Sequence, residues 1–239
     1  ISGTPQTIDA FDFVWNIATN PANLTQDELF AATWRGIYRS TNGGTTWNDA
    51  KLSDSGTVNT STVTTDVALT SYGVIYAHTR ENGFLKIWRS IDGVTWTSIA
   101  PNTFPTSSGR VVFATAPSDT SVLYTFIQGA NNTPAVNGHQ LWKYTYSDSG
   151  STWENRSANL PSDLSTQSGY DQTLHVKPDN IDFLLLGGTN LYRSTDGFKT
   201  SAATQTIGGY PYYPGGQHHP DMQGGMFKPT NPNIYYSSN

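Results

Sequence analysis

Two short segments of the chain combine imidazole and carboxylate side chains. They are residues 217–223, QHHPDMQ, and residues 170–175, YDQTLH. Their ionisable side chains are His218, His219 and Asp221 in the first segment, and Asp171 and His175 in the second. Such groups can exchange protons with a substrate or bind a metal ion. Because both segments lead into strands of the same kind, we expect the side chains to converge on one pocket. The His residues would bind ligand there, and Asp171 and Asp221 are the candidate catalytic residues.

Paired carboxylates are a second possible chemistry, because glycoside cleavage uses two of them about 5 to 10 Å apart. The carboxylates expected near strand starts or sheet ends are Asp9, Asp12, Asp66, Asp171 and Asp221. Their spacing in the sequence favours no particular pair.

Aromatic side chains that stack on sugar rings are a third possibility. Residues 210–216, YPYYPGG, are rich in Tyr, stiffened by Pro, and next to the His pair. We interpret Tyr212 and Tyr213 as ligand-binding residues at the mouth of a pocket. The alternative is that this loop only shields a sheet edge. A second long polar loop, residues 128–139, is also typical of binding segments.

A hairpin motif that recurs four times indicates the elements that position these residues. Its copies are residues 29–47, 87–96, 141–153 and 191–200. In each copy an apolar strand runs into a Ser/Thr/Asn/Asp/Gly turn, which usually delivers a Trp that we expect to pack against a neighbouring sheet. An Asx side chain can accept turn N–H groups, and Gly accepts positive φ. The key positions are Ser40, Asn42, Gly44, Trp47, Ser90, Asp92, Trp96, Trp153, Ser194 and Asp196.

This motif resembles the Asp-box, or BNR repeat, S-x-D-x-G-x-T-W. Residues 40–47, STNGGTTW, match it at full length with Asn42 in the Asp position, whereas the later copies are shortened or lack the Trp. The resemblance implies an all-β propeller of four-stranded antiparallel blades, as in sialidase-like, sortilin-like and xyloglucanase-like proteins. It also implies that these turns lie on an outer rim, away from the central pocket.

Enzyme patterns of the resembled proteins are matched only in part. The catalytic Asp of the xyloglucanase-like proteins would fall near residues 33–35, TWR, which contain no carboxylate, and the Arg-Ile/Leu-Pro motif of sialidases is absent. An H-x-D-x-H pattern keeps His219 and Asp221 but has Gln223 in place of its second His. We therefore expect no metal and no cofactor. The alternative role for the inner-strand His and Asp residues is to bond the backbone of neighbouring blades.

The repeat spacing divides the chain into four blades and part of a fifth. The turn Ser residues are at positions 40, 90, 147 and 194, so the intervals are 50, 57 and 47 residues. Such intervals suit four strands per repeat. We expect repeats at about 11–52, 63–100, 109–157, 170–207 and, in part, 218–239. Because propellers close with roughly 4 to 8 blades, residues 1–239 are interpreted as a single propeller domain or a fragment of one.

Composition argues against several classes of partner. The net charge is −5, and no basic patch is present to neutralise phosphates, so we expect neither nucleic acid nor membrane insertion. Cys is absent, so the chain has no disulfides and no thiolate chemistry. The low fraction of charged residues, with much Ser, Thr, Asn and Gly, suits an extracellular or cell-surface protein.

We therefore predict a secreted or cell-surface propeller that binds a glycan or a surface protein at the channel mouth. One alternative is a glycoside hydrolase with part of its active site outside this chain. Another is a structural scaffold segment of a larger surface protein. Propellers support all three functions, so the choice depends on the site.

Overall fold

The computed structural model describes residues 11–50, 52, 63–81, 84–105, 109–129, 138–212 and 218–239. This part of the chain is built from antiparallel strands and short 3-10 turns. The 3-10 turns are η3 (Ser157–Asn159), η4 (Gln167–Gly169), η5 (Ser201–Ala203) and η6 (Tyr210–Tyr212). Among these residues, no helix has the length and apolarity needed to cross a membrane. The chain divides into two compact units, Ile1–Ser107 and Ser108–Asn239.

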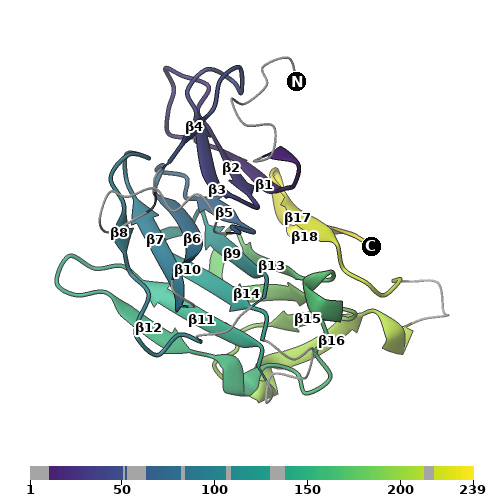
Figure 1. Ribbon diagram of the computed structural model, residues 1–239. Helices are drawn as coiled ribbons and strands as arrows, with labels where there is room; N and C mark the ends of the chain where they lie inside the picture. Colours follow the sequence, from purple (N-terminus) through teal and green to yellow (C-terminus); the bar gives the residue numbers. More distant parts are fainter. Residues whose placement is uncertain are drawn as a thin grey trace. The chain divides into compact units, whose positions relative to one another are not determined.

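The first unit contains two four-stranded sheets. The strands of the first sheet are β1 (Val14–Thr19), β2 (Leu29–Thr33), β3 (Gly36–Ser40) and β4 (Asn48–Asp49). Those of the second sheet are β5 (Val67–Leu69), β6 (Ile75–Glu81), β7 (Phe84–Ser90) and β8 (Thr97–Ser98). Within each sheet, every strand pairs antiparallel with the next strand in sequence (Figure 1).

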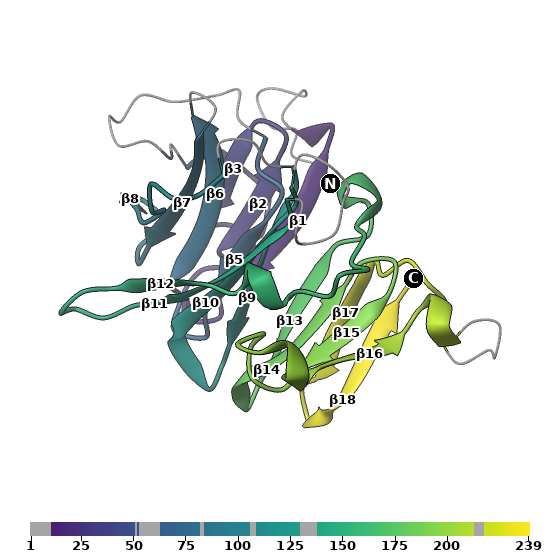
Figure 2. The same cartoon turned by 90° about the horizontal axis from the view of Figure 1, so that it is seen from below.

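The second unit contains two more four-stranded sheets and a two-stranded sheet. The strands of its first sheet are β9 (Val111–Ala116), β10 (Asp119–Ile127), β11 (Gln140–Thr145) and β12 (Thr152–Asn155). Those of its second sheet are β13 (Thr173–Lys177), β14 (Asn180–Gly187), β15 (Leu191–Ser194) and β16 (Thr204–Gly208). The pair β17 (Gly224–Lys228) and β18 (Asn231–Ser238) follows. The first strands contact each other in turn, β9 with β13 and β13 with β17 (Figure 2).

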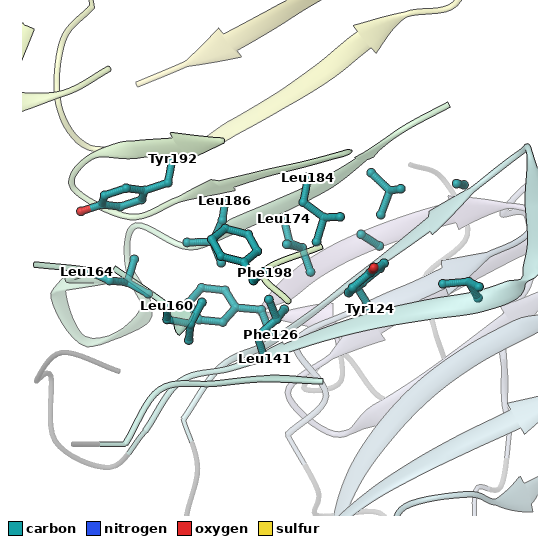
Figure 3. Packing of buried hydrophobic residues seen from close by; sticks show 14 residues of the cluster. Tyr124, Phe126, Leu141, Leu160, Leu164, Leu174, Leu184, Leu186, Tyr192 and Phe198 are labelled. Carbon is teal, nitrogen blue, oxygen red and sulfur yellow. The ribbon is translucent and has the colours of Figure 1, made fainter. Parts of the chain in front are cut away.

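Apolar side chains between adjacent sheets form the core of each unit. In the first unit, Phe30, Ile75 and Trp88 are buried between the two sheets. In the second unit, a larger cluster joins β9–β12 to β13–β16, with Phe126 and Leu184 at its centre (Figure 3). Alternate residues of each strand face this layer because side chains point to opposite faces with a period of two. This packing fixes the first strands, and thereby the segments that enter them.

The hairpin turns have the hydrogen bonds that the sequence motif predicts. In the turn after β7, Ser90 Oγ donates to Asp92 Oδ1 at 3.0 Å. The same carboxylate oxygen accepts the backbone N–H groups of Val94 at 2.8 Å and Thr95 at 2.7 Å. Burial opposes ionisation of Asp92, but these donors outweigh it and lower its pKa to about 2. The turn is therefore closed by an ionised carboxylate.

Replacement of the Asp changes this turn in two different ways. In the first copy, Asn42 Oδ1 accepts the Thr46 N–H at 2.9 Å. An amide oxygen therefore replaces the carboxylate oxygen as the acceptor of a backbone N–H across the turn. In the third copy, Ser149 replaces the Asp. Within the described part of the chain, its hydroxyl group has one hydrogen-bond partner, the Ser147 hydroxyl at 2.8 Å. The third turn therefore keeps the Ser position, and the acceptor that spans its loop is Ser151 Oγ, which accepts the Ser147 N–H at 3.3 Å.

Among the turn Trp residues, which were expected to pack against a neighbouring sheet, Trp96 contacts the core cluster of the first unit, to which both sheets contribute. Trp153 stacks on Tyr144 of its own sheet, with centroids 4.9 Å apart. Trp47 likewise packs on Phe11 at 5.3 Å, just before β1. Both rings stay half-exposed because the fourth strand is the outermost strand and offers its Trp only one partner strand.

The fourth turn fills the core in a way that the sequence motif did not predict. It lacks the Trp, and Phe198 within the turn is fully buried in the cluster of the second unit (Figure 3). Its φ of +57° is one that bulky residues rarely adopt. The N–H of Phe198 donates to Ser194 Oγ at 2.8 Å, which holds this conformation. An aromatic residue therefore anchors this turn from inside the loop.

The order of the strands separates these turns from the candidate site. Each four-stranded sheet runs up and down, so the turn between its third and fourth strands lies at the end opposite to the start of its first strand. Asp171 and Asp221 precede the first strands β13 and β17. The Ser-Asp turns therefore stabilise the hairpins from the far end and contribute no side chain to a site built around these two residues.

Candidate functional site

Asp171 and Asp221 come together from two segments far apart in sequence. Asp171 closes the segment that enters β13, and Asp221 lies in the segment that enters β17. Gln223 Nε2 donates to Asp171 Oδ1 at 2.5 Å, and Gln167 Nε2 donates to Asp221 Oδ1 at 2.9 Å. Asp171 Oδ2 is buried and has no hydrogen-bond partner among the described residues, and Asp221 acts on this carboxyl group at close range through its negative charge and through a proton that the two groups can share. The two candidate catalytic carboxylates therefore form one contact pair, which we call the Asp pair.

The surroundings of the Asp pair favour the protonated form of Asp171. This residue is fully buried, and burial together with the negative charge of Asp221 raises its pKa from 3.8 to about 6. The hydrogen bond from Gln223 and the positive charge of Arg110 act in the opposite direction but are smaller. Two carboxylates in contact cannot both ionise without strong repulsion. The pair can therefore hold a proton at pH values where an exposed Asp has none.

The backbone on both sides of the Asp pair is held in unusual conformations. Gln167, Ser168 and Asp221 have φ values of +45°, +64° and +76°. Each such residue costs about 1–3 kcal/mol unless its surroundings enforce it. Two backbone bonds do so, because the Asp221 N–H donates to Thr189 O at 3.1 Å and the Asp171 N–H donates to Thr166 O at 3.0 Å. The strain is thus concentrated where the two segments meet.

His175 lies on β13, away from the Asp pair. It is four residues further along the strand than Asp171, which corresponds to about 13 Å in an extended chain. Its ring packs against Tyr235 of β18 with centroids 5.5 Å apart. Burial lowers its pKa to about 4, so the imidazole is neutral at pH 7. His175 Nε2 and Tyr235 Oη are buried and have no hydrogen-bond partner among the described residues.

The other predicted ligand-binding residues contact β18 or their own segment, or fall outside the described part of the chain. His218 Nε2 lies 2.8 Å from Ser237 Oγ of β18. His219 Nδ1 lies 2.9 Å from Pro220 O. Tyr212 ends η6, and Tyr213 lies outside the described residues, as does most of the loop 128–139.

Two exposed Tyr residues lie on segments that are linked to the Asp pair, and Tyr210 opens the loop 210–216 that the sequence interpretation had singled out. Tyr170, next to Asp171, is 67% exposed, and Tyr210 is 57% exposed. The Tyr210 N–H donates to Asn190 Oδ1 at 2.8 Å, and the residue before Asn190 accepts the N–H of Asp221. We call the surface formed by Gln167, Tyr170, Tyr210, Asp221 and Gln223 the Tyr-Asp face. In the sequence, only their closeness to Asp171 and Asp221 could have indicated that Tyr170 and Gln223 belong to this surface.

Other inner-strand polar residues support the structural alternative. Asp66, which precedes β5, accepts Asn16 Nδ2 from β1 at 2.6 Å. Gln172, which precedes β13, donates to Phe126 O of the adjacent sheet at 3.1 Å. These side chains join neighbouring sheets, as expected for inner-strand residues without a catalytic role. Of the remaining carboxylate candidates, Asp12 is exposed, and Asp9 lies outside the described residues.

The first unit has a separate hollow of about 360 Å³. Its lining consists of Phe84, Leu85, Lys86, Ala100, Pro101, Asn102 and Phe104. None of these described lining residues is a carboxylate. In the part of the chain that the structure describes, no three His, Cys, Asp or Glu side chains are grouped closely enough to hold a metal ion.

No protein-family model and no curated protein matches this chain. Among solved structures it is similar to the GH74 enzyme of Niastella koreensis, with a TM-score of 0.55 and 18% identity over 81% of this chain and 30% of that one. It also matches an ancestral GH74 enzyme, with a TM-score of 0.48 and 14% identity over 94% of this chain and 38% of that one. The chain therefore spans about a third of the length of these enzymes.

The first of these similarities confirms the predicted fold class. GH74 enzymes are glycoside hydrolase β-propellers, so the four-stranded sheets described above are propeller blades. At 18% identity the similarity establishes the fold and assigns no activity to this chain.

Proposed function

We propose that this chain is part of an extracellular or cell-surface propeller of the Asp-box type, and that its Tyr-Asp face binds a neutral glycan. The observation that carries the proposal is the pairing of exposed aromatic rings with hydrogen-bonding side chains. Tyr170 and Tyr210 offer flat apolar surfaces, and Asp221 lies between the segments that bear them. Sugar rings present an apolar face and a rim of hydroxyl groups, so this combination is complementary to them.

Hydrogen bonding at the Tyr-Asp face suits hydroxyl groups. Carboxylate oxygens accept protons from sugar hydroxyls, and Gln amides both donate and accept. Asp221 is partly exposed and Gln223 is exposed, so both can be reached from solvent. Their partners within the protein leave lone pairs available, because each carboxylate oxygen can accept more than one hydrogen bond.

The charges around the face favour a neutral ligand over an acidic one. Asp171 and Asp221 both contribute carboxyl groups, and the nearest cation is Arg110. The guanidinium of Arg110 donates to the backbone oxygens of Gly169 at 3.0 Å and Tyr170 at 3.3 Å. It is therefore committed to positioning the segment before β13. A uronic or sialic acid would meet negative charge at this face, whereas an uncharged oligosaccharide would not.

Titration with oligosaccharides, followed by calorimetry, tests this proposal. We expect a neutral β-glucan or xyloglucan oligosaccharide to bind, and an acidic oligosaccharide of similar length to bind at least about tenfold more weakly. Tyr170→Ala and Tyr210→Ala should each weaken binding about tenfold or more, because each removes a stacking surface. Tyr72→Ala is the matched control, since Tyr72 is 78% exposed but lies in the first unit. Equal effects of Tyr72→Ala and Tyr170→Ala, or no binding of any glycan, would refute the proposal and favour a scaffold role.

A second candidate function is glycoside hydrolysis, which the raised pKa of Asp171 favours. A carboxylic acid with a pKa of about 6 can act as a general acid near neutral pH. Asp221 does not fit the role of its partner, because hydrolase carboxyl groups are about 5 Å or more apart and these two are in contact. A second carboxylate would have to come from elsewhere. Release of reducing sugar that Asp171→Asn abolishes and Asp148→Asn leaves intact would establish this activity.

A further inference from the structure

We propose that the Asp pair is a proton-dependent latch, which fastens the segment entering β17 to the segment entering β13. This inference concerns the regulation of the Tyr-Asp face, but it rests on contacts within the protein, and it would hold if that face bound no glycan. The latch is closed when Asp171 and Asp221 share a proton, and it is weakened when both are ionised.

The hydrogen bonds around the Asp pair are reciprocal. Gln223, on the β17 side, donates to Asp171 on the β13 side. Gln167, on the β13 side, donates to Asp221 on the β17 side. These two side-chain hydrogen bonds connect the segments, and a proton shared between the carboxyl groups adds a third at Asp171 Oδ2, which is otherwise buried without a hydrogen-bond partner among the described residues. Each amide can donate to its carboxyl in either protonation state, but the central bond exists only while one carboxyl carries a proton.

The latch also holds backbone that would otherwise relax. Gln167 and Ser168 on one side and Asp221 on the other have positive φ. Conformations of this kind persist only where surrounding contacts over-determine them. Once the shared proton is lost, the two carboxylates repel each other. The amide bonds and the backbone bonds of Asp171 and Asp221 must then hold the strained conformation against this repulsion. We therefore expect the segment 218–223 to open more often once the shared proton is lost.

The charged groups around Asp171 set the pH at which this happens. Asp221 faces it from the segment before β17, and Arg110 faces it from the segment before β9. Of the titratable groups on β13 and β18, His175 and Tyr235 pack against each other further along the sheets, and both are uncharged at pH 7. His218 contacts Ser237 of β18. Burial and Asp221 together outweigh Arg110, which gives Asp171 its raised pKa.

The direction of the pH effect follows from that raised pKa. The pKa of Asp171 is about 6 in the closed structure and 3.8 when the carboxyl is freely solvated. The latch therefore contributes its full stability below about pH 4, loses it progressively as pH rises to about 6, and contributes none above that. One proton is released for each latch that opens within this range.

Hydrogen–deuterium exchange of the whole 239-residue chain tests the latch. After correction for the intrinsic exchange rate, we expect protection of the amides in residues 220–228 to fall by up to about tenfold per pH unit between pH 4 and pH 6. Asp171→Asn and Asp221→Asn each remove the shared proton, so their protection should vary much less with pH. Asp148→Asn, in the exposed turn after β11, should behave like the unmodified protein. Comparison with Asp171→Asn cancels the separate effect of acid on buried His175.

Parallel pH profiles for the unmodified protein and both Asn variants would overturn the proposal. If the variants do not fold, ¹³C NMR titration of the unmodified protein replaces them. A carboxyl carbon of Asp171 that titrates near pH 6, together with amide shifts in residues 220–228, supports the latch. Titration of Asp171 near pH 4 refutes it. Neither measurement uses a glycan, so failure of the latch and failure of the glycan-binding proposal give separate results.

Discussion

Asp side chains at the two ends of the blades have pKa values shifted in opposite directions. Asp92, in a hairpin turn, is surrounded by N–H and hydroxyl donors, and its pKa falls to about 2 despite the opposing effect of burial. Asp171 is fully buried beside another carboxyl, and its pKa rises to about 6. The same residue type thus closes a turn as an anion at one end and can share a proton at the other. The difference lies in the number of donors within reach.

The turn carboxylates give a first prediction at this scale. Asp92→Ala should lower the free energy of unfolding by about 1–2 kcal/mol, because the N–H groups of Val94 and Thr95 lose their common acceptor. Asp92→Asn should cost much less, since Asn42 already occupies the same position in the first copy, where its Oδ1 accepts the Thr46 N–H. Urea unfolding of the three proteins at pH 7 measures this. Equal losses for the Ala and Asn variants would show that the charge matters and the acceptor geometry does not.

The sequence separation between a residue and its hydrogen-bond partner decides whether that contact can be predicted from the sequence. The Ser and Asp positions of the turns bond N–H groups within four residues, so a local pattern is sufficient to identify them. Gln167 and Gln223 find their partners 54 and 52 residues away, and no local pattern encodes such a contact. Asp171 and Asp221 were singled out by residue type and repeat position. Their direct contact emerges only when two blades pack together.

Strands are the next scale, and β13 shows how one strand serves two interfaces. Leu174 and Val176 point into the cluster shared with β9–β12. Asp171, Thr173 and His175 alternate with them and face the side of β17. Thr173 Oγ1 and His175 Nε2 are buried there without a hydrogen-bond partner among the described residues. Buried polar atoms of this kind reduce stability. The first face of β13 is therefore an apolar core, and the second carries a polar row.

Substitution of Thr173 tests the cost of this polar row. Thr173→Val replaces an unpaired buried hydroxyl by a methyl group of similar shape, so we expect stability to rise by about 1 kcal/mol. Thr79→Val is the matched control, because Thr79 Oγ1 accepts the indole N–H of buried Trp88 at 2.7 Å. That variant should lose about 1–3 kcal/mol, since it leaves a buried donor unpaired. Thermal unfolding of both variants at one pH is sufficient. A loss of stability in Thr173→Val would mean that its hydroxyl has a partner that a Val cannot replace.

Strand positions were more predictable from the sequence than strand lengths. The partial fifth repeat was expected within residues 218–239, and the structure has β17 at Gly224–Lys228 and β18 at Asn231–Ser238. The alternating apolar pattern and the Pro-Asn turn locate such a hairpin to within a few residues. In the second repeat, expected at about 63–100, the fourth strand is reduced to Thr97–Ser98. An outermost strand has one partner only, so its length depends on packing that a sequence pattern does not contain.

At the scale of the whole molecule, buried imidazoles dominate the expected response to acid. Burial lowers the pKa of His78 to about 3, with the charge of Arg80 adding to it. Burial also lowers the pKa of His139, and that of His175 to about 4. Below pH 6.5 the unfolded chain binds protons that these folded sites reject, so stability falls as pH drops. Asp171 acts in the opposite sense between about pH 4 and pH 6, because its folded form binds the proton more tightly.

The three buried imidazoles lower the stability of the fold in acid, and the single carboxyl of Asp171 opposes them, so we expect acid to be destabilising on balance. His78 and His175 each contribute about 1.4 kcal/mol per pH unit between pH 6.5 and their lowered pKa values, and His139 acts in the same direction. Asp171 offsets about one of them between about pH 4 and pH 6. We therefore expect the free energy of unfolding to fall steeply between pH 6.5 and pH 5, and to be nearly constant from pH 7 to pH 8. His78→Gln keeps a side-chain acceptor for the Thr65 N–H, which His78 Nε2 accepts at 2.8 Å, and should reduce the slope by about one proton. Denaturant unfolding at half-unit pH steps gives these slopes directly. A profile that stays flat to pH 5 would show that the imidazoles become protonated within the folded structure.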